Sequence, residues 1–271
     1  MVKIFTMVKG ESDIVEDWVL YHGTIFGYQN IFIIDNFSFD GTFEILLNLQ
    51  KKYNINLIQL PDYKKKGQYM TFLLKKYGKN DIVFPIDIDE FIIYYDKPSN
   101  LINCDKSLIL NYISSLPEFP VFKMNYIQSK NLEKNGYNKA TIESSYGKYD
   151  NCGSFAKTFF NSKLFKGEID HGNHYNTNNY ILTKLCLLHF HTRNLEQLKK
   201  KVYNNVKGLG YNPFDYNSLK KQLIINSNCE GFHHIIKQIK ILENNFNIDV
   251  EEKNIDDVDL KTFNNYVKSL F

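Results

Sequence analysis

Cysteine is scarce in this chain: its 271 residues include four cysteines, and no two of them form a CxxC pair. The four lie far apart, at Cys104, Cys152, Cys186 and Cys229. This spacing indicates neither a zinc ribbon nor a disulfide framework. Because a chain of this length can bury a full core without such links, we expect free thiols in a reducing compartment.

An excess of one charge is missing as well, because 33 basic and 30 acidic side chains leave a net charge of +3. Dedicated nucleic-acid binders usually carry a strong basic excess, so this balance argues against a nucleic-acid partner. With 43% hydrophobic and 23% charged residues, the composition is typical of globular proteins and excludes a disordered chain.

Long apolar runs are also absent from the sequence. No run approaches the roughly 20 apolar residues that a membrane helix needs. The apolar stretch at residues 2–8 is shorter than a signal-peptide core and is interrupted by Lys3. We therefore expect a cytoplasmic protein without a transmembrane segment.

The first hundred residues alternate strand and helix patterns. Strands are predicted at residues 2–8, 31–34, 55–60 and 81–86, and helices at residues 12–26, 40–49 and 68–77. Ser12 is expected to cap the first helix. Strands separated by helices of ten or more residues imply right-handed crossovers, so the pattern predicts an α/β fold with a mainly parallel sheet and flanking helices. Ligands of such sheets bind at the carboxyl ends of the strands.

The second half of the chain is less regular. A helix is predicted at residues 107–116, strands at 121–126, 154–161 and 185–191, and further helices at 195–206, 216–225, 231–246 and 260–270. The polar segment 128–153 is expected to be a loop, and His233 and His234 are expected to be structural. We predict one main domain at residues 1–205, with a helical C-terminal extension at residues 206–271 packed on it.

Two aspartates directly follow the fourth predicted strand, in the sequence Asp87-Ile88-Asp89-Glu90-Phe91. At positions i and i+2 of an extended backbone, the carboxylates of Asp87 and Asp89 share one side. Placed about 4 Å apart they repel by roughly 4 kcal/mol at an effective dielectric near 20, and a divalent cation removes that penalty. Mg²⁺ or Mn²⁺ suits oxygen ligands combined with a diphosphate. The alternative is a solvated turn after a strand.

Asp35 ends the second predicted strand, at the same edge of the sheet as Asp87. Its carboxylate either binds a base or ribose or shapes the turn, and the residues leave both open. Lysines at 64–66 precede Gln68 close to this edge, which makes Gln68 a candidate nucleotide contact. A second basic run, residues 199–201, is expected to be a solvated helix face.

Histidines end the predicted strand near residue 190. Alternation places His189 and His191 on one face, and a neutral imidazole can complete a metal site that carboxylates begin. His171 and His174 form a second cluster, so His171 is an alternative to His189 as a metal ligand. Arg193 either clamps a phosphate bidentately or pairs with a surface carboxylate.

Several motifs occur in an order that is itself informative. In chain order they are Lys9-Gly10-Glu11, Glu16-Asp17-Trp18, Tyr21-His22, residues 35–42, residues 87–91, Lys157-Thr158 and residues 189–194. Over residues 1–205 they resemble the GT-A glycosyltransferases of the family 2-like and family 92-like groups. The resemblance implies a Rossmann-like catalytic domain that binds a nucleotide-sugar, together with Mn²⁺ or Mg²⁺. It implies transfer of a sugar from a nucleoside-diphosphate sugar, with a UDP-sugar as the expected donor, to an acceptor hydroxyl.

The resemblance also implies roles residue by residue. Asp35 matches the acidic residue near the base and ribose, and Asp87 and Asp89 match the metal-binding pair. His189 matches the first position of a later motif and is the expected third metal ligand. Lys157 matches a basic residue that faces the diphosphate.

The expected reaction is inverting, which requires a carboxylate base that deprotonates the acceptor hydroxyl. Glu143 and Asp170 are the candidate bases, with Asp150 as the next choice. A metal held by Asp89 and His189, with help from Asp87, would neutralise the leaving diphosphate.

Two other functions stay open. A sugar nucleotidyltransferase also needs a metal-binding carboxylate pair, but it usually has a Gly-rich basic loop near its start, which Lys9-Gly10-Glu11 matches poorly. A non-catalytic sugar-binding or assembly protein on the same fold would be expected to lose its metal ligands first. The sequence determines neither the acceptor nor whether the chain forms a homo-oligomer.

Overall fold

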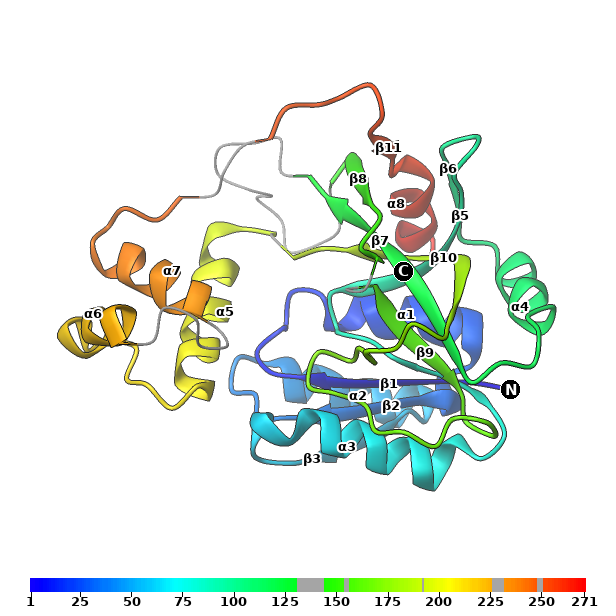
Figure 1. Ribbon diagram of the computed structural model, residues 1–271, viewed down its shortest axis with the longest axis horizontal. Coiled ribbons are helices and arrows are strands. Elements are labelled where there is room, and N and C mark those ends of the chain that lie inside the picture. The colour runs from blue at the N-terminus through cyan, green and yellow to red at the C-terminus, as the bar shows by residue number, and fades with distance from the viewer. Residues whose placement is uncertain (131–143, 154–155, 192, 226–231, 248–250) are drawn as a thin grey trace.

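The computed structural model describes residues 1–130, 144–153, 156–191, 193–225, 232–247 and 251–271 (Figure 1). The strands within these ranges are β1 (Val2–Val8), β2 (Ile31–Asp35), β3 (Asn56–Gln59), β4 (Ile82–Pro85), β5 (Glu90–Asp96), β6 (Leu101–Asn103), β7 (Val121–Ser129), β8 (Tyr146–Asp150), β9 (Lys157–Asn161), β10 (Ile181–His189) and β11 (Val258–Asp259). The α-helices are α1 (Val15–Phe26), α2 (Thr42–Tyr53), α3 (Lys66–Leu73), α4 (Lys106–Ser114), α5 (Leu195–Gly208), α6 (Tyr216–Ile225), α7 (Phe232–Leu242) and α8 (Lys261–Lys268). Short turns η1 (Tyr28–Asn30), η2 (Tyr63–Lys65) and η3 (Leu74–Gly78) complete the order.

One sheet organises the molecule, with strand order β3-β2-β1-β4-β9-β7-β10-β5-β6. The four strands from the first part of the chain, β3, β2, β1 and β4, pair in parallel. The predicted α/β class is therefore confirmed. Beyond β4 the sheet continues with antiparallel pairs and one further parallel pair, β7 with β10.

The inner parallel strands β1 and β2 are buried on both faces, as crossover helices require, whereas the edge strand β3 is partly exposed. Successive residues of β1 point to opposite sides, so Ile4 packs into the cluster that contains Trp18 of α1. Phe5 packs into the other cluster, with Met70 of α3. This explains why the apolar residues of β1 lie on both faces of the strand rather than on alternate positions.

The first helix begins differently from its prediction. Ile14 occupies the N-cap of α1 and makes no capping hydrogen bond through its side chain. Ser12, the predicted cap, instead donates its backbone N–H to Asp40. The β1–α1 connection is thus tied to the start of α2 rather than to its own helix.

Four of the described strands, β5, β6, β8 and β11, lie where no strand was predicted, and β5 and β8 are the longer two. β5 follows Asp89 directly and pairs antiparallel with β10, and β8 pairs with β7 inside the segment that was predicted to be a loop. Both assignments depend on partner strands distant in sequence. Local patterns do not specify such partners.

The C-terminal part divides into two regions. Helices α5, α6 and α7 share a small core of their own, which contains Val202, Leu219 and Ile235 (Figure 1). By contrast, β11 joins the sheet beside β8, and Phe263 of α8 packs into the main core. The predicted domain boundary at residue 205 falls inside α5. No helix within the described ranges is both long and apolar enough to cross a bilayer.

Candidate nucleotide and metal site

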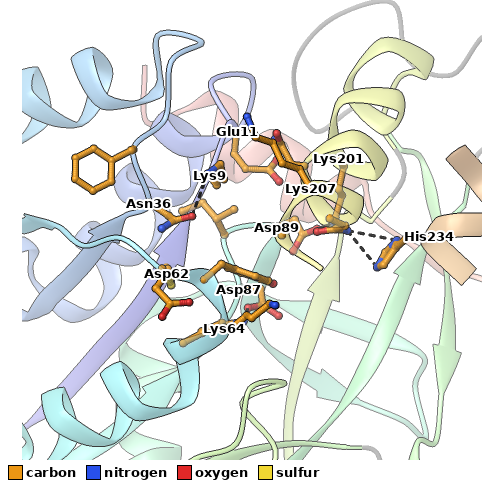
Figure 2. A pocket seen from close by; sticks show the side chains of 18 of the residues that line it. Lys9, Glu11, Asn36, Asp62, Lys64, Asp87, Asp89, Lys201, Lys207 and His234 are labelled. Carbon is orange, nitrogen blue, oxygen red and sulfur yellow. Dashed lines mark hydrogen bonds and ion pairs between the residues drawn. The ribbon is translucent and has the colours of Figure 1, made fainter. Parts of the chain in front are cut away.

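A cavity of about 690 Å³ opens at the carboxyl ends of the parallel strands, which is the size of a small-molecule site. Its walls come from the ends of the strands on one side and from α5 and α7 on the other (Figure 2). The polar residues that line it are Lys9, Glu11, Asn36, Asp62, Tyr63, Lys64, Lys66, Asp87, Asp89, His189, His191, Lys201, Asn204, Asn205, Lys207, His233 and His234.

The turn that carries Asp87 and Asp89 is held from beneath by α1. The indole Nε1 of Trp18 donates to the backbone oxygens of Asp87, at 3.1 Å, and of Glu90, at 2.9 Å. His22, one turn further along α1, accepts the backbone N–H of Ile92 at 3.3 Å. Burial lowers the pKa of His22 to about 3, so the imidazole is neutral and can accept. The Trp18 and His22 motifs therefore act as supports for the aspartate turn.

Strand pairing brings a histidine to the second aspartate. His189 lies opposite Glu90 in the β10–β5 register, and its Nε2 is 3.6 Å from Oδ2 of Asp89. The other ring nitrogen, Nδ1, lies 2.8 Å from the amide oxygen of Gln128. Because that oxygen can only accept, Nδ1 carries the hydrogen and Nε2 offers its lone pair to the cavity.

Three side chains in this corner have the spacing of a metal site. The ligand atoms of Asp89, His189 and His191 all lie within 4.8 Å of one another. The hydrogen bond from His189 to Gln128 is the kind of outer contact that orients a ligating imidazole. One carboxylate and two imidazoles fit a divalent cation, and the nitrogen ligands favour Mn²⁺ over Mg²⁺, which prefers oxygen.

Asp87 lies beside this cluster but has other partners. Its Oδ1 is 2.5 Å from Lys66 Nζ, and its Oδ2 is 2.8 Å from Lys157 Nζ. Lys157 also pairs with Glu90 at 3.0 Å. Burial alone would raise the pKa of Asp87, but the two lysines hold it below its usual range. Its charge is thus balanced within the protein, and Asp89 is the aspartate that faces the histidines.

A lysine from α5 enters the same corner. Lys201 Nζ is 2.5 Å from Oδ2 of Asp89 and 3.4 Å from Nδ1 of His191. The positive charge of Lys201, followed by burial and His189, lowers the pKa of His191 well below its usual range. Lys201 was predicted to lie on a solvated face. That prediction is wrong because this face of α5 is turned toward the cavity, where Lys201 meets Asp89.

Arg193 is buried, and its partners are carboxylates of the protein. Its Nε donates to Asp13 at 2.7 Å, its Nη2 pairs with Glu11, and its Nη1 donates to the carbonyl of Phe190 at 3.0 Å. The guanidinium therefore fastens the β1–α1 connection to the segment after β10. Of the two predicted roles, ion pairing is the one observed, in the interior rather than at the surface.

The lysines that line the cavity make it suitable for an anion. They are Lys9, Lys64, Lys66, Lys201 and Lys207. Burial, followed by the nearby charge of Lys207, lowers the pKa of Lys9. Since two like charges that face each other across a cavity repel, an anionic ligand between them is favoured.

Other predicted nucleotide contacts lie beneath or outside the cavity walls. Asp35 is fully buried and accepts hydrogen bonds from the backbone of Ser38, at 3.1 Å, and from Gln59, at 2.9 Å. It thus shapes the turn after β2, and its neighbour Asn36 lines the cavity. Gln68 is exposed on α3, whereas Lys66, two residues earlier, points into the cavity.

The predicted bases that the structure describes, Asp150 and Asp170, do not line the cavity either. Asp170 is exposed and accepts the backbone N–H of His174 at 2.7 Å. Asp150 is exposed at the end of β8. Glu143 lies outside the described residues. His171, the alternative metal ligand, packs against the ring of Tyr63, outside the cluster around Asp89.

His233 and His234 were predicted to be structural, but both line the cavity from α7. His234 lies 3.2 Å from the amide nitrogen of Asn205, and burial and the charges of His233 and Lys237 lower its pKa to about 3. The amphipathic pattern of α7 gave no sign of this placement, because it marks the apolar face and not what the polar face meets.

No protein-family model matches the sequence, and no curated protein matches it. Among solved structures, S. aureus TarS 1-349 is similar with a TM-score of 0.43 and 12% identity, over 88% of this chain and 70% of that chain. The same protein in complex with UDP-GlcNAc gives a TM-score of 0.40 and 13% identity, over 90% of this chain and 72% of that chain. A 4-diphosphocytidyl-2C-methyl-D-erythritol synthase from Anaerococcus prevotii gives a TM-score of 0.35 and 12% identity, over 78% of this chain and 96% of that chain. Likenesses of this size carry no functional assignment.

Proposed function

We propose that this protein is a GT-A glycosyltransferase that moves a sugar from a nucleoside-diphosphate sugar, with UDP as the expected nucleotide, to an acceptor hydroxyl. The observation that carries the proposal is the cluster of Asp89, His189 and His191 inside a lysine-lined cavity at the carboxyl edge of a parallel sheet. A divalent-cation site next to a surplus of lysines is suited to a diphosphate.

The residues of the chain have separate tasks in this proposal. Lys9 and Lys207 face the same space and attract the phosphates. Asp89, His189 and His191 would hold Mn²⁺, which when bound supplies charge neutralisation at the leaving diphosphate. Lys157 and Lys66 keep Asp87 ionised and fixed. A carboxylate base would take the proton of the acceptor hydroxyl, and Glu143 is tested before Asp170, because Asp170 does not line the described cavity.

A sugar nucleotidyltransferase is less well supported by the loop after β1. Such an enzyme needs free backbone N–H groups in this loop to hold a triphosphate. Here the N–H of Gly10 donates to Ser38 at 2.9 Å, and the N–H of Glu11 donates to Thr42 at 2.9 Å. Both donors are already used inside the protein.

Thermal unfolding with a panel of nucleotides, with and without Mn²⁺, tests the proposal. UDP and UDP-GlcNAc are the first probes, because UDP-GlcNAc is the ligand in one TarS complex. At about 100 times its Kd a ligand adds about 2.7 kcal/mol, which raises the Tm of a chain of this size by roughly 5–10 °C.

We expect a UDP shift that needs Mn²⁺, is lost in Asp89→Asn and is kept in the matched control Glu168→Gln, whose carboxylate is exposed away from the cavity. No shift with any nucleotide under any metal would refute a nucleotide-sugar enzyme. Release of UDP in the presence of an acceptor panel then separates transfer from binding. Loss of turnover with normal UDP binding in Glu143→Gln or in Asp170→Asn would identify the base.

A further inference from the structure

Lys201 occupies the place that a cation would take in the Asp89 cluster. Its ammonium lies 2.5 Å from the carboxylate of Asp89 and 3.4 Å from the ring nitrogen of His191. Figure 2 shows Lys201 reaching down from α5 to Asp89, on the side of the cavity opposite Lys9 and Asn36. The ion pair is well shielded, because the Asp89 side chain is 5% exposed and that of Lys201 is 20% exposed.

A divalent ion and this ammonium cannot share the corner. A bound ion lies about 2.0–2.2 Å from carboxylate and imidazole ligands. The ammonium group already lies in contact with two of the three ligand groups, the carboxylate of Asp89 and the imidazole of His191. Two positive charges at such a separation also repel strongly in a shielded cavity. Entry of the ion therefore requires Lys201 to move.

The fold gives Lys201 a place to go. Lys201, Asn204, Asn205 and Lys207 all line the cavity, which means that one face of α5 is turned toward it. The lysine side chain is a flexible stem with a compact charge. Lys207 lines the cavity from the same helix, so an ammonium group that leaves Asp89 has the space beside Lys207 within the cavity open to it.

We propose that Lys201 and a divalent cation compete for Asp89, and that the displaced Lys201 then binds the diphosphate of the donor. The inference rests on the proposed function and adds an order of events: the cation binds first, and the donor meets a cavity with one more available lysine. It gives Lys201 two effects of opposite sign, since it weakens cation binding and strengthens nucleotide binding.

Titration with Mn²⁺, followed by the paramagnetic resonance signal of the free ion, measures the first effect without any nucleotide. In Lys201→Met, which keeps the length of the side chain, we expect Mn²⁺ to bind about tenfold more tightly, because the ion no longer has to displace a resident charge. Lys200→Met is the matched control: Lys200 is the adjacent lysine of α5, pairs with Asp40 and lies outside the cavity. Its Mn²⁺ affinity should equal that of the wild type.

The second effect is measured by calorimetric titration with UDP at saturating Mn²⁺. Lys201→Met should bind UDP more weakly than the wild type, although it binds Mn²⁺ more tightly. Lys201→Gln should show the same two changes, which guards against a packing defect of one variant. Unchanged or weaker Mn²⁺ binding in both variants refutes the competition, and unchanged UDP binding refutes the contact with the diphosphate.

These outcomes are distinct from failure of the proposed function. If UDP binds the wild type without Mn²⁺ and this binding is lost in Lys201→Met, the lysine is itself the site's cation. That result would refute competition between Lys201 and the cation, but it would still support a nucleotide-binding site. If the wild type and both Lys201 variants bind neither Mn²⁺ nor UDP, the proposed function and this inference both fail.

Discussion

His189 lies directly opposite Glu90 in the antiparallel pairing of β10 with β5, and this register sets its imidazole 3.6 Å from Asp89. His189 and Asp89 are 100 positions apart in the chain. A shift of the register by one residue would turn His189 to the other face of the sheet. The candidate cation site is therefore only as well defined as the pairing of these two strands.

The contact between His189 and Gln128 should control cation binding. Gln128→Leu removes the oxygen that orients the imidazole and fixes its tautomer. We expect Mn²⁺ affinity to fall about 10- to 100-fold, as is typical when an outer contact of a ligating histidine is lost. Gln128→Glu keeps an acceptor at this position and should restore binding. Equal affinity in Gln128→Leu and in the wild type would mean that His189 is not a ligand.

Trp18 should support the aspartate turn through its indole N–H. Trp18→Phe leaves the buried carbonyls of Asp87 and Glu90 without that donor. We expect the free energy of unfolding to fall by about 1–3 kcal/mol, measured by urea denaturation. Tyr69→Phe, which removes a hydrogen bond to Pro61 at the surface, is the control and should change it far less. Equal losses in the two variants would contradict a special role of Trp18.

Arg193 should be a structural clamp rather than a phosphate contact. Arg193→Met leaves the buried Glu11 and the half-buried Asp13 without their cation. Removing one member of a buried ion pair costs about 3–5 kcal/mol, which urea denaturation would detect. In Lys199→Met, which breaks an exposed pair with Glu196, the change should stay within about 1 kcal/mol. A stable Arg193→Met that binds UDP poorly would instead favour the phosphate role.

Asp17 should make the stability of the fold depend on pH. Burial, followed by the charges of Glu16 and Asp13, raises its pKa to about 7, and its Oδ2 has no hydrogen-bond partner among the described residues. The folded state thus holds a proton that the unfolded state releases near pH 4. The stability that this bound proton gives to the folded state is fully present below pH 4 and is lost as the pH rises toward 7.

The measurement compares urea denaturation of the wild type with that of Asp17→Asn at pH 4 and pH 8. In the wild type, the free energy of unfolding should fall by no more than about 4 kcal/mol between these two pH values, given the size of the pKa shift of Asp17. Asp17→Asn should not show this fall. The two proteins should therefore differ more at pH 8 than at pH 4. Glu168→Gln removes an exposed carboxylate that does not contribute to the raised pKa of Asp17, and it should leave the pH profile of the wild type in place. Parallel profiles of Asp17→Asn and the wild type would contradict the raised pKa.

Local patterns in the sequence predicted most helices and strands of the first half and several helices of the second half. The strand at residues 2–8 coincides with β1, and α6 has the predicted bounds, because hydrophobic periodicity alone marks such segments. Strands β5, β6, β8 and β11 were missed. Strand β5 begins immediately after the aspartate turn and pairs with β10, and β8 pairs with both β7 and β11. Single-segment patterns contain no information about such partners.

The residues of the candidate site also divide into those that the sequence pointed to and those that it could not distinguish or missed. Sequence order brought attention to Asp87, Asp89 and His189, because polar residues that end buried strands gather at one edge. It did not separate Asp87, whose charge two buried lysines balance, from Asp89, which faces the histidines. It also missed Lys201, since a lysine on a helix has the same local pattern whether its face meets water or a cavity.

The sequence by itself determined the α/β alternation and the strand ends at which chemistry is concentrated, because both follow from periodicity and chain direction. Only the tertiary structure decided which charges meet. Pairings such as Lys201 with Asp89 and Arg193 with Glu11 join residues more than a hundred positions apart. Their strength depends on burial and distance, and both quantities exist only once the sheet and α5 have packed together.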